Sequence, residues 1–391
     1  MMRRTKMAGS RSGLLYFVFG FCCASVLFFF QSNYASDSRR SIIIKSHPKE
    51  TVKQITEDDN DLNERPEILF NPDHDDDHGQ NQGMFMHTHE ENAVAQSLKE
   101  SVKVFCWIMS AKKNMDKAKT VNSTWAPRCN KYVFMSANES VGVPTVNLDV
   151  QEGREYLWAK TKAAFTWIYE NEIEDYDWFL KADDDTYVVM ENLRFMLLAY
   201  SPDDPLYFGC KFKPFTKQGY MSGGSGYVLS REAVKRFVSD AIPDPQKCKQ
   251  KGTGAEDAEL GKCLEKVGVI AGDSRDSEGR HRMLPFSPLT HLQAGGNKTV
   301  PDWFHKYMYY PYVQGRECCS DYMISFHYVN KGTMYALDNL LYHIRPIGFF
   351  DELWANTLEN NQGKSIIDAL KDLALKTSQP LNTDEKKEKT D

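Results

Sequence analysis

The amino-acid sequence predicts an α/β fold with a mostly parallel sheet, placed behind a membrane-spanning segment and a polar stem. Two observations predict the fold. Strand-like and helix-like runs alternate from Ser101 onward, and three aspartates follow one strand-like run directly. Such alternation builds a parallel sheet with helices on both faces, and ligands bind beyond the carboxyl ends of its strands. At 391 residues and 41% hydrophobic content, the chain can form one large domain or two small ones.

The first predicted element is a membrane anchor at residues 14–30, an apolar run of 17 residues without a charge. As a helix it spans about 25 Å, which suits the thinner membranes of the early secretory pathway. Basic residues in the segment 1–13 predict a cytosolic tail. A cleaved signal peptide is the alternative, disfavoured by the length of the run and the lack of an A-x-A site. Under either interpretation the rest of the chain is luminal or extracellular.

Residues 31–97 are predicted to form a disordered luminal stem, because they are highly polar and show no periodic pattern. His74, His78, His87 and His89 of this segment can ligate metal, but a solvated polar stem is the preferred interpretation. The folded domain is expected over residues 98–355, and a C-terminal helix with a charged flexible tail over 356–391. A net charge of −6 and the absence of a basic stripe argue against nucleic acid as a partner.

Apolar periodicity defines the elements of the folded domain. Strands are expected over Val102–Met109, Tyr132–Met135, Trp178–Ala182 and Tyr227–Leu229, and helices over Asn114–Trp125, Arg154–Glu170, Leu193–Tyr200 and Arg231–Ala241.

The aspartates 183, 184 and 185 directly follow the strand-like run Trp178–Ala182. Neighbouring carboxylates repel each other and raise each other's pKa, and a divalent cation with oxygen preferences relieves that repulsion. A solvated acidic turn is the alternative. The position beyond the end of a strand favours a metal site that can hold a phosphate group.

Two later segments contribute further candidates. The glycine-rich run 218–230 either lets the backbone approach a ligand or makes a tight turn, and the sequence does not choose between these. Thr253 and Glu256 form a capping-box pattern at a helix start. Asp257 lies at the start of the buried stripe of that helix, where a carboxylate at a cleft can act as general base. Periodicity does not choose between Asp257 and Glu256.

His327 lies in a strand-like run, Ile324–Val329. A lone histidine in such a run is more often a hydrogen-bonded core residue than a ligand. A carboxylate site that needs one more ligand makes the two interpretations about equal.

Seven cysteines follow the apolar run, so at least one is unpaired. The sequence does not determine their connectivity. We predict the pairs Cys106–Cys129, Cys248–Cys263 and Cys318–Cys319, with Cys210 free. The lack of C-x-x-C pairs disfavours a zinc module. Glycosylation sequons at Asn122, Asn138 and Asn297 agree with a luminal domain.

The motifs KADDDTYV, GYMSGGSGYVLS, AEDAELGKC, AGDSRDS, CCSD and SFHYV occur in this order. Together they resemble the core 1 β1,3-galactosyltransferases of glycosyltransferase family 31, over about Val102–Arg345. The resemblance implies a GT-A (Rossmann-like) nucleotide-sugar transferase domain, a single-pass type II protein of the Golgi membrane, and Mn²⁺ dependence. It also implies inverting transfer of galactose from UDP-galactose to O3 of GalNAc α-linked to Ser or Thr of glycoproteins.

The resemblance also implies roles for individual residues. Asp257 matches the general base, and UDP is the leaving group on the opposite side. The remaining positions are metal ligands Asp183, Asp185 and His327, nucleotide-sugar contacts Lys181, Asp184 and Arg128, and acceptor contacts Tyr220, Trp303 and Glu256.

Three other functions remain open at this stage. A related family 31 transferase with another donor or acceptor, such as a fringe-like enzyme, is disfavoured by CCSD with SFHYV. A non-catalytic chaperone homologue is disfavoured because the chain keeps the aspartate cluster. A luminal lectin is the third. A homodimer partner and a chaperone partner are further candidates that the sequence does not decide.

Overall fold

A computed structural model describes residues 89–137, 142–293, 300–344 and 365–380, which all belong to one compact unit, Gln82–Asp391. Its centre is a seven-stranded sheet in the order β10-β6-β9-β4-β1-β2-β3. Strand β9 pairs antiparallel with β4 and β6, and the other neighbouring strands pair in parallel. The predicted α/β class with a mostly parallel sheet is therefore confirmed.

The strands are β1 (Val104–Met109), β2 (Lys131–Ala137), β3 (Thr145–Leu148), β4 (Trp178–Asp183), β5 (Tyr187–Val188), β6 (Leu206–Gly209), β7 (Lys211–Phe212), β8 (Tyr220–Met221), β9 (Tyr227–Ser230), β10 (Ile270–Ala271), β11 (Met283–Leu284) and β12 (Ser325–Phe326). The α-helices are α2 (His89–Ser101), α3 (Met115–Asn122), α4 (Leu157–Asn171), α5 (Met190–Leu197), α6 (Arg231–Arg236), α7 (Glu256–Lys266), α8 (Pro288–Leu292), α9 (Asp302–Tyr307), α10 (Lys331–Tyr342) and α12 (Ile366–Thr377). Short 3₁₀ turns cover Lys112–Asn114, Ala126–Arg128, Arg154–Tyr156 and Arg316–Cys318.

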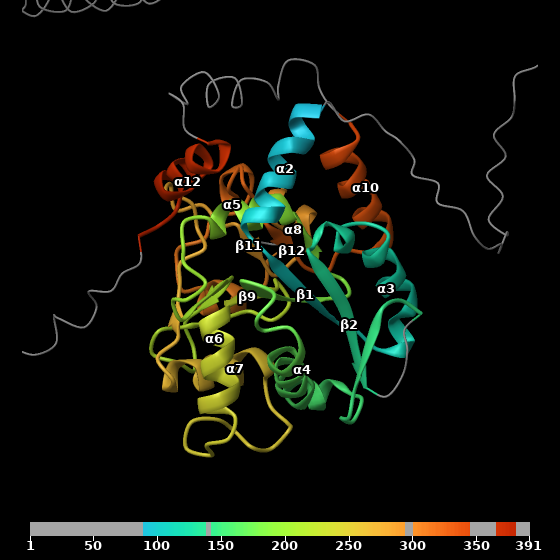
Figure 1. Cartoon of the computed structure of the whole chain (residues 1–391), viewed down its shortest axis with the longest axis vertical. Coiled ribbons are helices and arrows are strands. Elements are labelled where there is room, and N and C mark those ends of the chain that lie inside the picture. The colour runs from blue at the N-terminus through green and yellow to red at the C-terminus, as the bar shows by residue number, and fades with distance from the viewer. Residues whose placement is uncertain (1–88, 138–141, 294–299, 345–364, 381–391) are drawn as a thin grey trace, which may run out of the picture. The chain divides into compact units, whose positions relative to one another are not determined.

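Helices cover both faces of the sheet, with α2, α5 and α12 on one side and α4, α6 and α7 on the other (Figure 1). Alternate residues of each central strand supply the two cores, because successive side chains of a strand point to opposite faces. In β1, Val104, Cys106 and Ile108 face α5, whereas Phe105 and Trp107 face α4.

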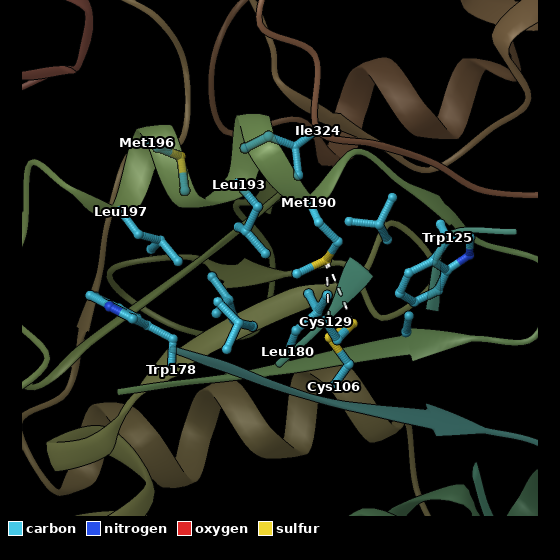
Figure 2. Packing of buried hydrophobic residues seen from close by; sticks show 14 of the residues in the cluster. Cys106, Trp125, Cys129, Trp178, Leu180, Met190, Leu193, Met196, Leu197 and Ile324 are labelled. Atoms are coloured by element: carbon cyan, nitrogen blue, oxygen red, sulfur yellow. Dashed lines mark hydrogen bonds between the residues drawn. A yellow bond between two sulfur atoms is a disulfide. The ribbon is translucent and has the colours of Figure 1, made fainter. Parts of the chain in front are cut away.

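The α5 side of the core packs around a disulfide (Figure 2). Met190 of α5 places its sulfur 3.8 Å from Cys129 Sγ, and Leu193 packs in the same cluster. Trp178 and Leu180 of β4 line the floor of this cluster and are buried. This packing fixes β4, and therefore the aspartates that follow it.

A second, three-stranded sheet joins distant parts of the chain, in the order β11-β12-β5. Strand β12 pairs antiparallel with β5, which places Phe326 opposite Tyr187. The residue after β12 thus lies beside the residues before β5. His327 and Asp185, 142 positions apart in sequence, become neighbours through this pairing.

The folded region begins before the predicted boundary at residue 98. Helix α2 starts at His89, and its Val94 and Leu98 are buried against the α5 core. The stem prediction is therefore wrong for residues 89–97. The predicted C-terminal helix exists as α12, whose Leu370 and Ala374 are buried.

The predicted membrane anchor at residues 14–30 and the stem up to residue 88 lie outside the described residues. Within the described part of the chain, the helices are too short or too polar to cross a bilayer.

The cysteine pairs are Cys106–Cys129, Cys248–Cys263 and Cys318–Cys319, the same three that the sequence analysis named. Cys210 is free and buried. The predicted helix Arg231–Ala241 instead consists of α6 and one π-helical turn, Phe237–Ala241, because its last residues adopt a wider backbone coil.

Candidate active site at the carboxyl end of the sheet

Two carboxylates and one imidazole meet where β4 ends. One ligand atom from each of Asp183, Asp185 and His327 lies within 4.8 Å of the others. His327 Nε2 is 3.0 Å from Asp185 Oδ1 and 3.6 Å from Asp183 Oδ2. These three residues are the predicted metal ligands, and the structure brings them together. Oxygen and imidazole donors at this spacing suit a divalent cation.

Positive groups already surround Asp185. Lys117 of α3 places Nζ 2.9 Å from Asp185 Oδ2, and half of its side chain is exposed. Burial alone would raise the pKa of Asp185. The hydrogen bonds and charges of His327 and Lys117 outweigh burial and hold this pKa well below its usual range. Asp185 is therefore ionised under physiological conditions, as a metal ligand must be.

Asp184 is not part of this cluster, although Lys117 Nζ lies 3.9 Å from its Oδ1. It is buried, and Ser110 donates a hydrogen bond to its Oδ2 at 2.7 Å. Burial raises the pKa of Asp184 to about 6, although the hydrogen bond from Ser110 opposes the rise. Ser110 follows β1, so Asp184 joins the ends of two adjacent strands.

The glycine-rich loop between β8 and β9 separates the metal ligands from α7. A Cβ on Gly224 would overlap the ring of His327. Gly224 O also accepts a hydrogen bond from the Thr186 hydroxyl at 2.9 Å. The sequence left open whether these glycines serve a turn or a close approach. At Gly224 the close approach to His327 requires glycine.

Lys181 of β4 lies beneath this loop and is 2% exposed. Its Nζ donates to Asp183 Oδ1 at 2.5 Å and to Gly223 O at 3.0 Å. The N–H of Gly223 in turn donates to Asp257 Oδ2 at 3.1 Å. Lys181 was predicted to contact the nucleotide, and in the structure both of these bonds are made to the protein.

Glu256 and Asp257 form the first turn of α7. Glu256 is buried, and its Oε1 accepts hydrogen bonds from Tyr227 at 2.5 Å and Thr161 at 3.0 Å. The cap residue of α7 is Ala255, and it makes no side-chain cap bond. The capping-box interpretation was therefore wrong, because Glu256 bonds to side chains of the sheet and α4 instead of the helix end.

Asp257 is the less enclosed of the two carboxylates. Besides the bond from Gly223, it accepts the N–H of Ala258 at 2.8 Å. Burial raises the pKa of Asp257, and these two N–H groups partly oppose the rise. A carboxylate with a raised pKa is a stronger base than an ordinary aspartate, which suits general base chemistry.

A cluster of aromatic rings connects His327 with α7. The ring centroids of His327 and Tyr328 are 3.9 Å apart, and the ring of Tyr328 stacks on that of Phe286. Phe286 contacts Trp303, and Trp303 contacts Phe212. The cluster ends at Tyr220, whose ring packs against Phe212 next to α7.

The two predicted acceptor residues of this cluster differ in exposure. Trp303 is 46% exposed, whereas Tyr220 is 3% exposed. Tyr328 and Phe215 are also more than half exposed, and both have left-handed backbone, with φ of 52° and 72°. Residues held in this strained region concentrate at functional sites.

Arg128 does not lie at this edge of the sheet. It leads into β2 at the end where Lys131 pairs with Phe105, opposite to the end that carries Asp183. Its guanidinium binds Asp338 at 3.0 Å and lies over the ring of Tyr342. The structure therefore does not bring Arg128 to the edge that carries Asp183, because it lies at the other end of the parallel strands, and its contact with the nucleotide stays a prediction.

The sequons have different environments. Asn122 ends α3, and its Oδ1 accepts a hydrogen bond from Tyr132 at 3.0 Å. Asn138 and Asn297 lie outside the described residues.

Sequence reasoning missed Lys117, Thr161, Tyr227 and Ser110. Lys117 lies on a polar helix without a strong apolar stripe, so no pattern marked it. Tyr227 had a signal, since it directly follows the glycine-rich run and faces the same side of the sheet as Lys181, its register partner.

An α/β sheet whose carboxyl edge holds a carboxylate–imidazole cluster beside a buried acidic helix start is typical of nucleotide-sugar glycosyltransferases. Residues 100–276 match the Fringe-like family model. A glycoprotein-N-acetylgalactosamine 3-beta-galactosyltransferase 1 from Xenopus laevis is 46% identical over 264 residues, which cover 67% of this chain and 72% of that protein. The chain belongs to the glycoprotein-N-acetylgalactosamine 3-beta-galactosyltransferase family of glycosyltransferase family 31.

More distant relatives share part of the chain. A beta-1,3-glucosyltransferase from Mus musculus is 27% identical over 209 residues, which cover 52% of this chain and 40% of that protein. Among solved structures, the galactosyltransferase LgtC in complex with donor and acceptor sugar analogues has a TM-score of 0.36 at 13% identity, covering 64% of this chain and 99% of that one. A likeness of this size does not establish a common fold, so the GT-A designation stays a prediction.

Proposed function

We propose that this chain transfers galactose from UDP-galactose to O3 of GalNAc-α-Ser/Thr on glycoproteins, with inversion at the anomeric carbon. The observation that carries the proposal is the placement of Asp257 and the Asp183–Asp185–His327 cluster on two sides of one glycine-rich loop. Inversion by a single displacement requires a base on the acceptor side and charge stabilisation on the leaving-group side. The relative from Xenopus supports the choice of sugar and acceptor.

A divalent cation, which we propose to be Mn²⁺, fits the donor set of two carboxylates and one imidazole. When bound, it supplies charge stabilisation for the departing diphosphate. Asp183, Asp185 and His327 hold it, and Gly224 fixes the ring of His327 by close packing.

The base is Asp257. Its carboxylate accepts the proton of the acceptor O3 hydroxyl, and O3 forms a bond to C1 of galactose. The bond from C1 to the diphosphate oxygen breaks on the opposite face, and UDP leaves with that electron pair. Asp184 is a candidate contact for the nucleotide sugar, because it faces the adjacent strand end at Ser110.

The aromatic cluster is the candidate acceptor surface. Exposed aromatic rings can stack on the apolar face of a pyranose. Trp303 and Tyr328 supply two such rings, and both contact the ring of Phe286. Tyr220 supports Phe212 from beneath. Glu256, whose Oε1 is fully used by Tyr227 and Thr161, has Oε2 left for a contact with the acceptor.

We further propose that the chain is a single-pass type II protein of the Golgi membrane with its catalytic domain in the lumen. The apolar run at residues 14–30 and the three disulfides support this location. A homodimer and a chaperone remain candidate partners, and nucleic acid is not proposed.

The test measures transfer by the full chain from UDP-galactose to a GalNAc-α-Thr peptide, with Mn²⁺ or with chelator. Product with Gal-β1,3-GalNAc linkage that requires the metal is the expected result. Asp257→Asn should lower kcat by roughly 10²–10⁴-fold, because the base is lost. Parallel reactions with other UDP-sugars test whether the donor is a sugar nucleotide other than UDP-galactose. The match to the Fringe-like family model makes this the relevant alternative function. Near-full transfer by Asp257→Asn would falsify the assignment of the base.

A further inference from the structure

Lys181 is the buried cation among three carboxylates of the site. Its Nζ bonds to Asp183, and the charges of Asp183, Glu256 and Asp257 all act on it. Burying an ammonium group costs free energy unless it is paired and hydrogen-bonded, and Lys181 is both. Lys181 Nζ makes one hydrogen bond to Asp183, a proposed metal ligand. It makes another to the carbonyl oxygen of Gly223 in the glycine-rich loop.

The Gly223 peptide group continues this link to the base. Its carbonyl accepts from Lys181 Nζ at 3.0 Å, and its N–H donates to Asp257 Oδ2 at 3.1 Å. A Cβ at Gly223 would lie 2.7 Å from Glu256 Oε2, which is too close for a side chain at this position without a shift. The hydrogen bonds thus connect Asp183, Lys181, Gly223 and Asp257 without a gap.

Neighbouring contacts hold this link in place. Tyr227 is the register partner of Lys181 in the β4–β9 pair, and its hydroxyl binds Glu256. The ammonium of Lys181 lies 5.7 Å from the centroid of the Tyr227 ring. The first turn of α7 is therefore tied to β4 by two routes, one through Gly223 and one through Tyr227.

We propose that Lys181 is a positioning residue, which together with the Gly223 peptide group holds the base Asp257 at a fixed separation from the metal ligand Asp183. This inference rests on the proposed function. Lys181 was predicted to contact the nucleotide. In this proposal it instead aligns the base on the acceptor side with the metal ligands on the leaving-group side. Displacement of a catalytic group by about 1 Å can cost 10²-fold in rate, so a fixed separation matters.

Lys181→Met tests the proposal in the full chain. We expect kcat to fall by about 10²-fold, while the KM for UDP-galactose and the calorimetric affinity for Mn²⁺ with UDP change far less. The affinity is retained because removal of the ammonium leaves the Asp183 oxygen available to the cation. A loss of donor affinity in proportion to kcat would show instead that Lys181 contacts the nucleotide and would overturn the proposal.

The matched control is Lys131→Met. Lys131 pairs with the buried Glu172 at 2.6 Å, so its loss also removes an ammonium partner from a carboxylate, but at the opposite end of the strands. We expect this variant to lose stability and to keep its kcat. Equal losses of kcat in both variants would mean that destabilisation alone explains the effect.

Gly223→Ala is a second test in case Lys181→Met does not fold. The added Cβ would lie 2.7 Å from Glu256 Oε2, so the loop or that carboxylate beside Asp257 must shift. We expect lowered kcat with retained affinity for Mn²⁺ and UDP. Unchanged kcat in a folded Gly223→Ala protein would also overturn the proposal. If the unaltered chain transfers no galactose, the proposed function fails. If it transfers galactose and both variants keep full kcat, only the positioning role fails.

Discussion

At the scale of single residues, burial sets the chemistry of the acidic groups. Asp184, Glu256 and Asp257 all have pKa values raised by burial, whereas His327 and Lys117 lower that of Asp185. The site therefore keeps one carboxylate firmly ionised for a cation and others more basic than usual. The resemblance predicted Asp183, Asp185 and His327 as one cluster, and the structure brings these three together. The role of Asp257 as base stays a prediction. The motif did not show that Arg128 precedes its strand, whereas Asp183 ends one, so the two lie at opposite ends of the parallel strands.

The raised pKa of Asp257 predicts a pH dependence of transfer. Asp257 must be ionised to accept a proton, so kcat/KM should fall as the pH is lowered through its pKa. Burial raises this pKa despite Lys181 and two backbone N–H groups, so the midpoint should lie above about 3.9, the ordinary value for aspartate. The measurement is a pH profile with parallel circular dichroism to exclude unfolding.

The charge of Asp257 also acts on Glu256 and Tyr220, and Glu256→Gln is the control for that profile. An acid limb that disappears in Glu256→Gln while transfer continues would assign the titration to Glu256 instead. A midpoint below the ordinary aspartate value would contradict the expectation for Asp257.

At the scale of elements, the alternation of apolar residues predicted the central strands well. The first helix, α2, was missed because its sequence is mostly polar, and within residues 94–101 only Val94 and Leu98 are buried apolar residues. Helix α2 is stabilised by packing against α5 and α12. Both helices are distant from it in sequence, so a local pattern does not predict it. The π-helical turn Phe237–Ala241 has no local signal either.

The loop containing Gly224 gives a prediction for metal affinity. A Cβ there would overlap the His327 ring, so Gly224→Ala should weaken Mn²⁺ binding by roughly 10–100-fold, as losses of supporting contacts at metal sites do. Calorimetry with Mn²⁺ is the measurement. Gly332→Ala is the matched control, because a Cβ there would make an ordinary van der Waals contact, with Asn330 Oδ1 at 3.6 Å. Equal affinity in both variants would show that His327 does not depend on the loop.

Helix α12 gives a prediction for stability. Leu370 is 3% exposed and packs in the α5 core, whereas Leu375 of the same helix is 53% exposed. Leu370→Ala should lower the free energy of unfolding by about 2–5 kcal/mol. Leu375→Ala should have little effect. Urea unfolding compares the two, and a similar small loss in both would mean that α12 does not contribute to the cooperative core.

At the scale of the whole molecule, a cation that binds the folded state should stabilise it. At 100 times its dissociation constant the stabilisation is about 2.7 kcal/mol. We expect Mn²⁺ to raise Tm in thermal unfolding, and chelator to reverse the rise. Asp185→Asn should abolish the response because one ligand loses its charge. A rise of equal size in that variant would place the bound cation elsewhere.

The pairing of β12 with β5 also has a consequence for the order in which the protein is completed during synthesis. The strands of the large sheet are encoded before residue 272, so the sheet can form while later residues are still in the ribosome. His327 joins Asp185 only after β12 has emerged and closed a long loop, which is a slow type of contact. An unfinished chain that ends before β12 could therefore form the large sheet but would lack His327, one of the three proposed ligands of the cation. Retention of metal would mark the moment when β12 has joined β5 in a newly made molecule, with α10 and α12 still to pack.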